Sequence, residues 1–338
     1  GITCIMISHK LNEIREVADA ITIIRDGRSV ETLRVDGSVD EDRIIRGMVG
    51  RSLGARFPER VRNIGDVLLE VRDWTVRHPQ LTDRLVCKGS SFFVRRGEIV
   101  GFAGLMGAGR TELARSLFGR SYGIFEKGEL LVDGQPIVAS SVAEAIRAGI
   151  AYVPEDRKTL GLNLLDSIKE TIVSANPGRI SRRAVLDLNR EFAAAESFRQ
   201  SLRIKTSSVN QGVATLSGGN QQKVVLGKWL FTEPRLLILD EPTRGIDVGA
   251  KYEIYGIIQQ LVEAGKGVIV ISSELPEVIG LADRIYTICE GAITGVVDRA
   301  DANQELLMRM MTSNHATPPG STAGPSRRSA FVRPGVLQ

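Results

Sequence analysis

The sequence GLMGAGRT at residues 104–111 follows an apolar segment and leads into a helical pattern. Its glycines allow successive backbone N–H groups to turn toward one phosphate, and the helix start adds a positive dipole. Arg110 stands where such loops usually carry lysine, and it grips phosphate as a planar fork rather than as a point charge. We expect either a nucleotide phosphate site with impaired turnover or an ordinary glycine-rich turn. The candidate binding residues are Gly104, Gly107, Ala108, Gly109, Arg110 and Thr111.

Two acids follow a second apolar segment, in the sequence RLLILDE at residues 235–241. An aspartate at the end of a buried strand can hold Mg²⁺, and a second acid beside it can orient or deprotonate an attacking water. We assign these roles to Asp240 and Glu241, and expect the Thr111 hydroxyl to share the Mg²⁺. The alternative, two surface acids after a strand, is disfavoured because the glycine-rich loop lies upstream in the same domain.

A second helix start, at Ser217, Gly218 and Gly219, offers another set of backbone N–H groups and a hydroxyl to an anion. Two such elements in one domain make sense if this one faces a nucleotide that another domain holds. Taken alone, the same pattern also fits a serine cap before a glycine turn.

Strand and helix patterns alternate around these motifs. Apolar strand-like segments at residues 98–104, 235–240 and 267–272 are separated by helical stretches. This alternation predicts an α/β domain over residues 66–312, with a largely parallel sheet and a helical insertion at about 155–215.

The beginning of the chain repeats a later part of it, because residues 1–27 align without a gap with residues 265–291. Residues 1–34 are expected to form a strand, a helix and a hairpin. The repeat predicts a duplicated domain whose first copy has lost its upstream part, so we interpret the chain as a fragment or a truncated product. Residues 35–65 are expected to form a linker, and residues 313–338, rich in Pro, Gly, Ser and Arg, a disordered tail.

Composition limits the possible partners. Basic residues exceed acidic ones by 44 − 40 = 4 and aromatic residues make up 5%, which gives little support for nucleic-acid binding. The three cysteines lie far apart and predict neither a disulfide framework nor a zinc site, which fits a reduced cytoplasmic setting. No apolar run approaches the roughly 20 residues that span a bilayer. We therefore expect any membrane role to come through partners.

Taken together, the motifs resemble those of the nucleotide-binding domains of ABC transporters. The stretches GLMGAGRTEL, YVPEDRK, LSGGNQQK and LDEPTRGIDVGAK are similar to the second ATP-binding domain of bacterial simple-sugar importers of the ribose, galactoside and xylose type. The resemblance covers residues 66–312, and residues 1–34 resemble the end of the first such domain. It implies a P-loop NTPase fold of ABC type, with a mostly parallel sheet, an antiparallel β part and an inserted helical subdomain.

The resemblance also implies further site residues. Glu155 stands where the family usually offers glutamine to Mg²⁺ and water, and Ser273 stands where it has the switch histidine. The first copy keeps that histidine as His9. We expect His9 and Glu241 both to be catalytic, each in a different one of the two ATP sites. Gln221 belongs to the serine-glycine element, and Asp247 resembles the acid that communicates between the two sites.

The family's Mg²⁺-dependent ATP hydrolysis implies the partners. Two domains meet head to tail and sandwich two ATP molecules, so a second nucleotide-binding domain is expected. The subunit would lie on the cytoplasmic face of the bacterial inner membrane. It would drive permease subunits, docked on the helical insertion, and a periplasmic sugar-binding protein would deliver the sugar. Because Arg110 and Ser273 replace the lysine and histidine, this site is expected to bind ATP but hydrolyse it poorly, although the retained Glu241 argues the other way.

Some alternatives remain open at the level of sequence. Trp74 or His78 could stack on adenine, although a core or surface role suits them better. A soluble ABC ATPase acting in DNA repair or on ribosomes should carry strongly basic or zinc-bearing insertions, and none is visible. A truncated remnant that binds nucleotide without turnover is the other rival. The sequence does not identify the sugar.

Overall fold

A computed structural model describes residues 2–7, 11–25, 27–36, 39, 43–44, 47–48, 57, 60–183 and 185–312. The predicted catalytic residue His9, most of the predicted linker and the predicted tail therefore lie outside the described residues. Among the described residues, no helix combines the length and the apolar character needed to cross a bilayer.

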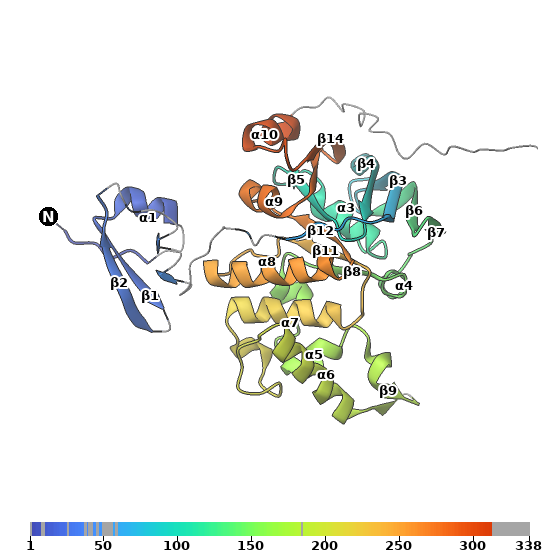
Figure 1. Ribbon diagram of the computed structural model, residues 1–338. Helices are drawn as coiled ribbons and strands as arrows, with labels where there is room; N and C mark the ends of the chain where they lie inside the picture. Colours follow the sequence, from blue (N-terminus) through green and yellow to red (C-terminus); the bar gives the residue numbers. More distant parts are fainter. Residues whose placement is uncertain are drawn as a thin grey trace, which may run out of the picture.

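A six-stranded sheet forms the centre of the molecule, in the order β14-β13-β5-β12-β11-β8 (Figure 1). All neighbouring pairs are parallel except β13 and β14, which form an antiparallel edge. The strands β5, β8, β11 and β12 are buried along their whole length, as continuous apolar runs predict for a parallel sheet covered on both faces. The strands are β5 (Ile99–Gly104), β8 (Ile150–Val153), β11 (Leu236–Asp240), β12 (Gly267–Ile271), β13 (Arg284–Cys289) and β14 (Ala292–Asp298).

A separate antiparallel sheet with the order β4-β3-β6-β7 packs its apolar side chains into the same core. This sheet is the antiparallel part that the family resemblance implies. Its strands are β3 (Val67–Arg77), β4 (Leu85–Arg95), β6 (Ile124–Val132) and β7 (Gln135–Ile137).

Helices join and cover the central strands. They are α3 (Arg110–Leu117), α4 (Val142–Arg147), α7 (Gly218–Leu230), α8 (Val248–Glu263), α9 (Leu275–Leu281) and α10 (Gln304–Thr312). The predicted helical insertion lies between β8 and α7, and it also contains a short hairpin whose two strands have two residues each. It comprises η1 (Arg157–Gly161), α5 (Ile168–Val173), η2 (Pro177–Ile180), β9 (Ser181–Arg182), β10 (Val185–Leu186), α6 (Leu188–Ser201) and η3 (Val213–Thr215). In Figure 1, α5 and α6 lie beyond α7, on the side away from the antiparallel sheet.

The N-terminal elements α1 (Leu11–Val17), β1 (Ala20–Arg25) and β2 (Arg28–Arg34) reproduce α9, β13 and β14 with a constant offset of 264 residues. Even the irregularity of the hairpin recurs, between Ile23 and Ile24 in β1 and between Thr287 and Ile288 in β13. The structure thus supports the internal repeat inferred from sequence.

The strand predicted at the start of the chain does not form. Residues 2–7 have no strand structure, and Ile2, Ile5 and Ile7 are exposed. The corresponding strand β12 is held on one side by β11 and on the other by β5. Residues 2–7 pair with no strand among the described residues, so their β propensity alone does not create one.

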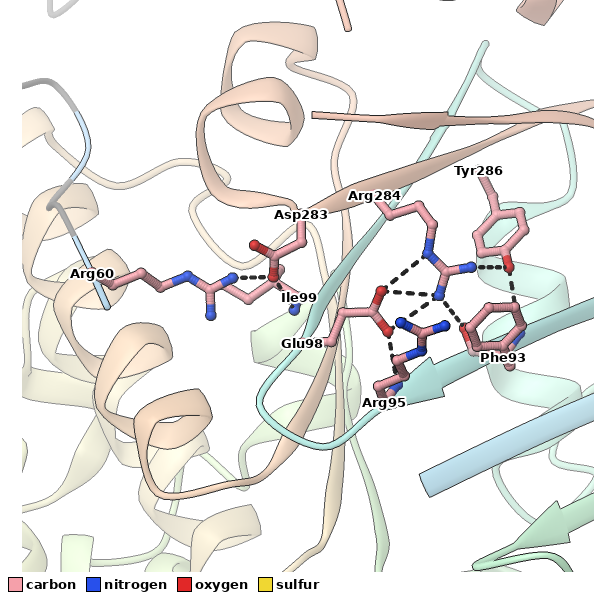
Figure 2. Close-up of polar contacts among 8 residues, drawn as sticks. All are labelled: Arg60, Phe93, Arg95, Glu98, Ile99, Asp283, Arg284 and Tyr286. Carbon is pink, nitrogen blue, oxygen red and sulfur yellow. Dashed lines mark hydrogen bonds and ion pairs between the residues drawn. The ribbon is translucent and has the colours of Figure 1, made fainter. Parts of the chain in front are cut away.

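Part of the predicted linker lies against the second domain. The Arg60 guanidinium, 5% exposed, forms an ion pair with Asp283 (Figure 2) and donates to the Gly97 carbonyl at 3.3 Å. The Phe57 ring lies 5.2 Å from the ring of Tyr255. These contacts show that Phe57 and Arg60 pack on the domain, whereas Val39 and Ile44 are buried against the N-terminal hairpin.

A buried ion pair lies beside this contact, at the amino-terminal end of β5. Figure 2 shows the Arg284 guanidinium directed at Glu98, Tyr286 and the Phe93 carbonyl. Its Nε donates to Glu98 at 3.0 Å and its Nη1 donates to the Tyr286 hydroxyl at 2.7 Å. This end of the sheet is therefore fixed by buried charge, while the candidate site lies at the opposite end.

Candidate functional site

The glycine-rich loop connects β5 to α3 at the carboxyl ends of the parallel strands, where ligands bind in open α/β sheets. Gly107 and Gly109 have φ angles of 75° and 103°, which favour glycine. A Cβ atom on Gly109 would also lie 2.9 Å from the Val86 carbonyl oxygen. The loop is held from the other side by the Gly291 N–H, which donates to the Ala108 carbonyl at 2.8 Å.

Arg110 begins α3 and has a buried side chain. Its Nη1 donates to the Ser272 carbonyl at 2.7 Å, and its Nη2 lies 3.9 Å from Glu241 Oε1. The guanidinium therefore bridges the phosphate loop to the ends of β11 and β12.

Asp240 ends β11 and is completely buried. Its Oδ2 accepts a hydrogen bond from the Tyr152 hydroxyl at 2.9 Å, while its Oδ1 has no hydrogen-bond partner in the described structure. Burial raises the pKa of Asp240, although hydrogen bonds from Thr111 and Tyr152 counteract the rise. A buried carboxylate with an unused oxygen next to a threonine hydroxyl is suited to a cation.

Glu241 follows in a left-handed backbone conformation with φ of 49°, which is uncommon outside glycine. Burial also raises the pKa of Glu241, while the Arg110 charge lowers it. The Ser273 hydroxyl donates to Glu241 Oε2 at 3.1 Å. Five predicted residues from distant parts of the sequence therefore come together: Arg110, Thr111, Asp240, Glu241 and Ser273.

Ser217 is the exposed N-cap of α7, and its hydroxyl accepts from Asn220 at 3.0 Å instead of capping the helix backbone. A Cβ atom on Gly219 would lie 2.6 Å from that of Ala250, so glycine allows α7 to approach α8 closely. Gln221 is buried and donates to the Val213 carbonyl at 3.3 Å. The amide thereby stabilises the loop before the helix, and the ligand contact implied for Gln221 stays a prediction.

Glu155 and Asp247 lie in loops near this helix start. Glu155 forms an ion pair with Arg244, and Asp247 accepts a hydrogen bond from the Ala250 N–H at 2.9 Å as the N-cap of α8. Arg157 donates to the Arg244 carbonyl at 2.9 Å. The loop after β8 is thereby tied to the loop that links Glu241 to Asp247.

Residues 87–244 match the family model described as ABC transporter. The chain therefore contains an ABC transporter domain. Over 92% of its length it is 59% identical to the L-arabinose transport ATP-binding protein AraG of Geobacillus stearothermophilus. Over the same share it is 48% identical to the xylose import ATP-binding protein XylG of Thermoanaerobacter pseudethanolicus and 46% identical to the ribose import ATP-binding protein RbsA of Bacillus cereus. The chain spans 61% of the length of each of these three relatives.

Solved ABC structures share the fold. The ADP conformation of an ABC transporter's ATP-binding cassette matches with a TM-score of 0.57 at 19% identity, covering 75% of this chain and 97% of that chain. A nucleotide-free cassette matches with a TM-score of 0.59 at 18% identity, covering 75% of this chain and 98% of that chain. These matches confirm the predicted P-loop fold of ABC type.

Sequence reasoning missed a cleft of about 450 Å³ beside the phosphate loop of this ABC domain. Side chains from the start of β4 and from the turn before β14 line it together with the loop, among them Arg84, Lys88 and Glu290. No sequence motif marks these residues, because only the packing of the two sheets brings them to the loop.

Trp74, considered above for stacking on adenine, belongs to the core, where its indole donates to the Ser116 hydroxyl at 3.0 Å.

Proposed function

We propose that this chain contains the ATP-binding and ATP-hydrolysing domain of a subunit that powers import of a simple sugar through a membrane permease. The observation that carries the proposal is the meeting of Arg110, Thr111, Asp240 and Glu241 at the carboxyl ends of β5 and β11. The names of the arabinose, xylose and ribose transport relatives support the coupling to sugar import. They do not favour a soluble ATPase unrelated to transport.

The residues at this site fit Mg²⁺ bound with a nucleotide. Mg²⁺ is usually held by one or two protein oxygens together with phosphate oxygens and water. The unpartnered Oδ1 of Asp240 and the neighbouring Thr111 hydroxyl would supply those protein oxygens. The ion would neutralise phosphate charge during hydrolysis.

Arg110 would bind phosphate oxygens with the guanidinium N–H groups that its contacts with Ser272 and Glu241 leave available. Its contacts with the Ser272 carbonyl and Glu241 hold the guanidinium at the mouth of the loop. Backbone N–H groups of residues 107–111 would bind the same phosphates. Glu241, directed by Ser273 and Arg110, would then orient the attacking water and accept its proton.

We further propose that this site hydrolyses ATP slowly. Arg110 and Ser273 stand in place of lysine and histidine, so the arrangement favours binding over turnover. The second site would combine Ser217 of this domain with the phosphate loop of another cassette, and His9 would act there. Exposure of Ser217 at the start of α7 supports its contact with an opposing domain.

The helical insertion is the proposed docking surface for permease subunits on the cytoplasmic face of the inner membrane. It exposes apolar side chains that a partner could cover, including Leu165, Val185 and Leu188. A periplasmic binding protein would bring the sugar to the permease, without contact with this chain.

The asymmetry can be tested in the complete two-cassette subunit reconstituted with its permease. Replacing His9 should abolish sugar uptake, whereas Glu241→Gln should leave a substantial fraction of it. Equal loss in both variants would contradict unequal sites. Failure of the unsubstituted complex to consume ATP during uptake would contradict the proposed function.

A further inference from the structure

A second buried acid, Glu277, lies behind the candidate site and belongs to none of the predicted motifs. It sits in the first turn of α9 and is only 2% exposed. The Ser272 hydroxyl donates to its Oε2, and the Thr243 hydroxyl donates to its Oε1 at 2.7 Å. The Tyr255 hydroxyl of α8 also hydrogen-bonds to it. One carboxyl group therefore joins three separate segments.

Each of these segments reaches a different part of the site. Ser272 offers its carbonyl to Arg110 at 2.7 Å and immediately precedes Ser273. Thr243 lies within the loop between Glu241 and Asp247, whose end is the N-cap of α8. Glu277 thus has an indirect connection to the phosphate loop on one side and to the Asp247 loop on the other.

A purely structural role would not require a carboxyl group here. Burying an acid costs free energy that hydrogen bonds must offset, and apolar residues of similar size fill such positions at lower cost. Glu98 carries the same burial cost at the other end of the sheet, but it is matched there by the Arg284 guanidinium. Glu277 instead interacts with hydroxyl groups, each located on a loop or helix next to the site.

The internal repeat provides an independent indication. Ser8, Leu11 and Glu13 align with Ser272, Leu275 and Glu277. The intervening switch position differs, since His9 aligns with Ser273. The serine and the glutamate are thus present in both copies even though the residue between them has changed.

We propose that Glu277 is a positioning residue that holds the Ser272 carbonyl, and through it Arg110, in place for the terminal phosphate of ATP. This inference rests on the proposed function. The terminal phosphate would extend from the loop toward Glu241, which lies 3.9 Å from Arg110, and toward Ser273, whose hydroxyl donates to Glu241. ADP lacks that phosphate, so loss of the position of Arg110 should weaken ATP binding much more than ADP binding.

The test compares equilibrium affinities of the full chain for Mg²⁺-ATP and Mg²⁺-ADP in three variants. Glu277→Ala should reduce the ratio of ATP affinity to ADP affinity by roughly tenfold, because about one charge-assisted contact with the terminal phosphate is lost. Thr243→Val removes one anchor of the carboxyl and should reduce the preference in the same direction. Glu277→Gln keeps the shape of the side chain, and one hydroxyl can turn to accept from its amide NH2, so this variant should remain within about twofold of the unsubstituted chain.

Glu98→Gln provides the matched control. It alters a similarly buried carboxyl just before β5, at the end of the sheet away from the site, so it should lower the melting temperature without changing the ATP preference.

An unchanged preference in both Glu277→Ala and Thr243→Val would overturn the inference and leave the proposed function standing. Equal loss of ATP and ADP binding in all three variants would also overturn it, since that pattern indicates general loss of structure. Absence of nucleotide binding by the unsubstituted chain would overturn the proposed function as well.

Discussion

At the scale of single residues, the candidate site depends on charges that are buried and only partly compensated. Arg110 donates to the Ser272 carbonyl and lies 3.9 Å from the Glu241 carboxylate. Asp240 has one oxygen without a hydrogen bond in the described structure. Sequence spacing predicted these residues because strand, loop and acid have a fixed order in such sites. It could not predict the Tyr152 hydroxyl on Asp240, since that contact depends on the pairing of β8 with β11.

Replacing Arg110 by alanine should weaken Mg²⁺-ATP binding by roughly tenfold or more, because a charge-assisted contact with phosphate is worth about 1.5–3 kcal/mol. Arg115 on the same helix provides the control, since its guanidinium lies over Tyr122 away from the loop. Titration calorimetry on both alanine variants should show a large loss for Arg110 only. Equal affinities in the two variants would contradict a phosphate contact by Arg110.

Asp240→Asn should remove most of the Mg²⁺ dependence of nucleotide binding. In the unsubstituted chain, chelation of Mg²⁺ should lower ATP affinity, because the ion links phosphate to Asp240 and Thr111. In the variant, affinities measured with Mg²⁺ and with excess chelator should converge. A variant that keeps the full dependence would show that Asp240 does not hold the ion.

At the scale of elements, sequence patterns predicted the strands well where they are fully buried. The apolar segments at 98–104, 235–240 and 267–272 became β5, β11 and β12 with nearly the same bounds. The equally apolar residues 2–7 did not form a strand, because no neighbouring strand pairs with them in the described structure. Local pattern therefore predicts a strand only when partner strands are present.

The conformation of the phosphate loop can be tested with two glycines. Gly109 and Gly134 both have positive φ, but a Cβ atom would meet the Val86 carbonyl oxygen only at Gly109. Gly134→Ala should lower the free energy of unfolding by about 1 kcal/mol, from backbone strain alone, and leave ATP affinity unchanged. Gly109→Ala should be more destabilising and should also abolish ATP binding. Urea unfolding and titration calorimetry would check both outcomes, and retained binding in Gly109→Ala would contradict the loop's role.

The helix α9 should make the stability of the molecule dependent on pH. Burial raises the pKa of Glu277 above its ordinary value of 4.5, although Ser272, Thr243 and Lys251 lower it, and Glu274 adds a like charge. Because the folded-state pKa is raised, the contribution of Glu277 to the free energy of unfolding is complete below the unfolded-state pKa. That contribution is lost as pH rises through the folded-state pKa. Glu277→Gln should therefore gain stability relative to the unsubstituted chain as pH rises from about 5 to about 8.

Glu170 supplies a control of opposite sign for this pH dependence. The Ser167 hydroxyl lowers its pKa, so its contribution is present above the unfolded pKa and is lost as pH falls. Urea unfolding should show that Glu170→Gln is less stable than the unsubstituted chain, and that this difference in the free energy of unfolding shrinks toward acid pH. Parallel curves for Glu277→Gln and the unsubstituted chain would contradict a raised pKa at Glu277.

At the scale of the whole molecule, Phe57 and Arg60 of the predicted linker contact the domain that follows it. Asp283 is 8% exposed and forms an ion pair with Arg60 (Figure 2). It also accepts a hydrogen bond from the Ile99 N–H at 2.8 Å. The sequence predicted a linker from its polar residues, but it could not show that Arg60 is buried. The fold class was predictable from the alternation of strands and helices, whereas this packing depends on Gly97 and Asp283 meeting in three dimensions.

Arg60→Ala should destabilise the fold by about 3–5 kcal/mol, because it leaves Asp283 as a buried acid without its closest partner. Arg62 lies 3.2 Å from the same carboxyl but is 47% exposed, so Arg62→Ala should cost about 1 kcal/mol or less. Urea unfolding of the two alanine variants gives the comparison. Similar small losses in both would contradict a structural anchor at Arg60.

The central claim is that the glycine-rich loop and the two acids of this chain form one site for Mg²⁺-ATP. Its most direct test is titration calorimetry of the unsubstituted chain with Mg²⁺-ATP, repeated with the Arg110→Ala, Asp240→Asn double variant. The account predicts one nucleotide bound per chain, displaceable by ADP, and no measurable binding in a double variant that still unfolds cooperatively. Binding of equal strength in the two proteins, or none in the unsubstituted chain, would contradict it.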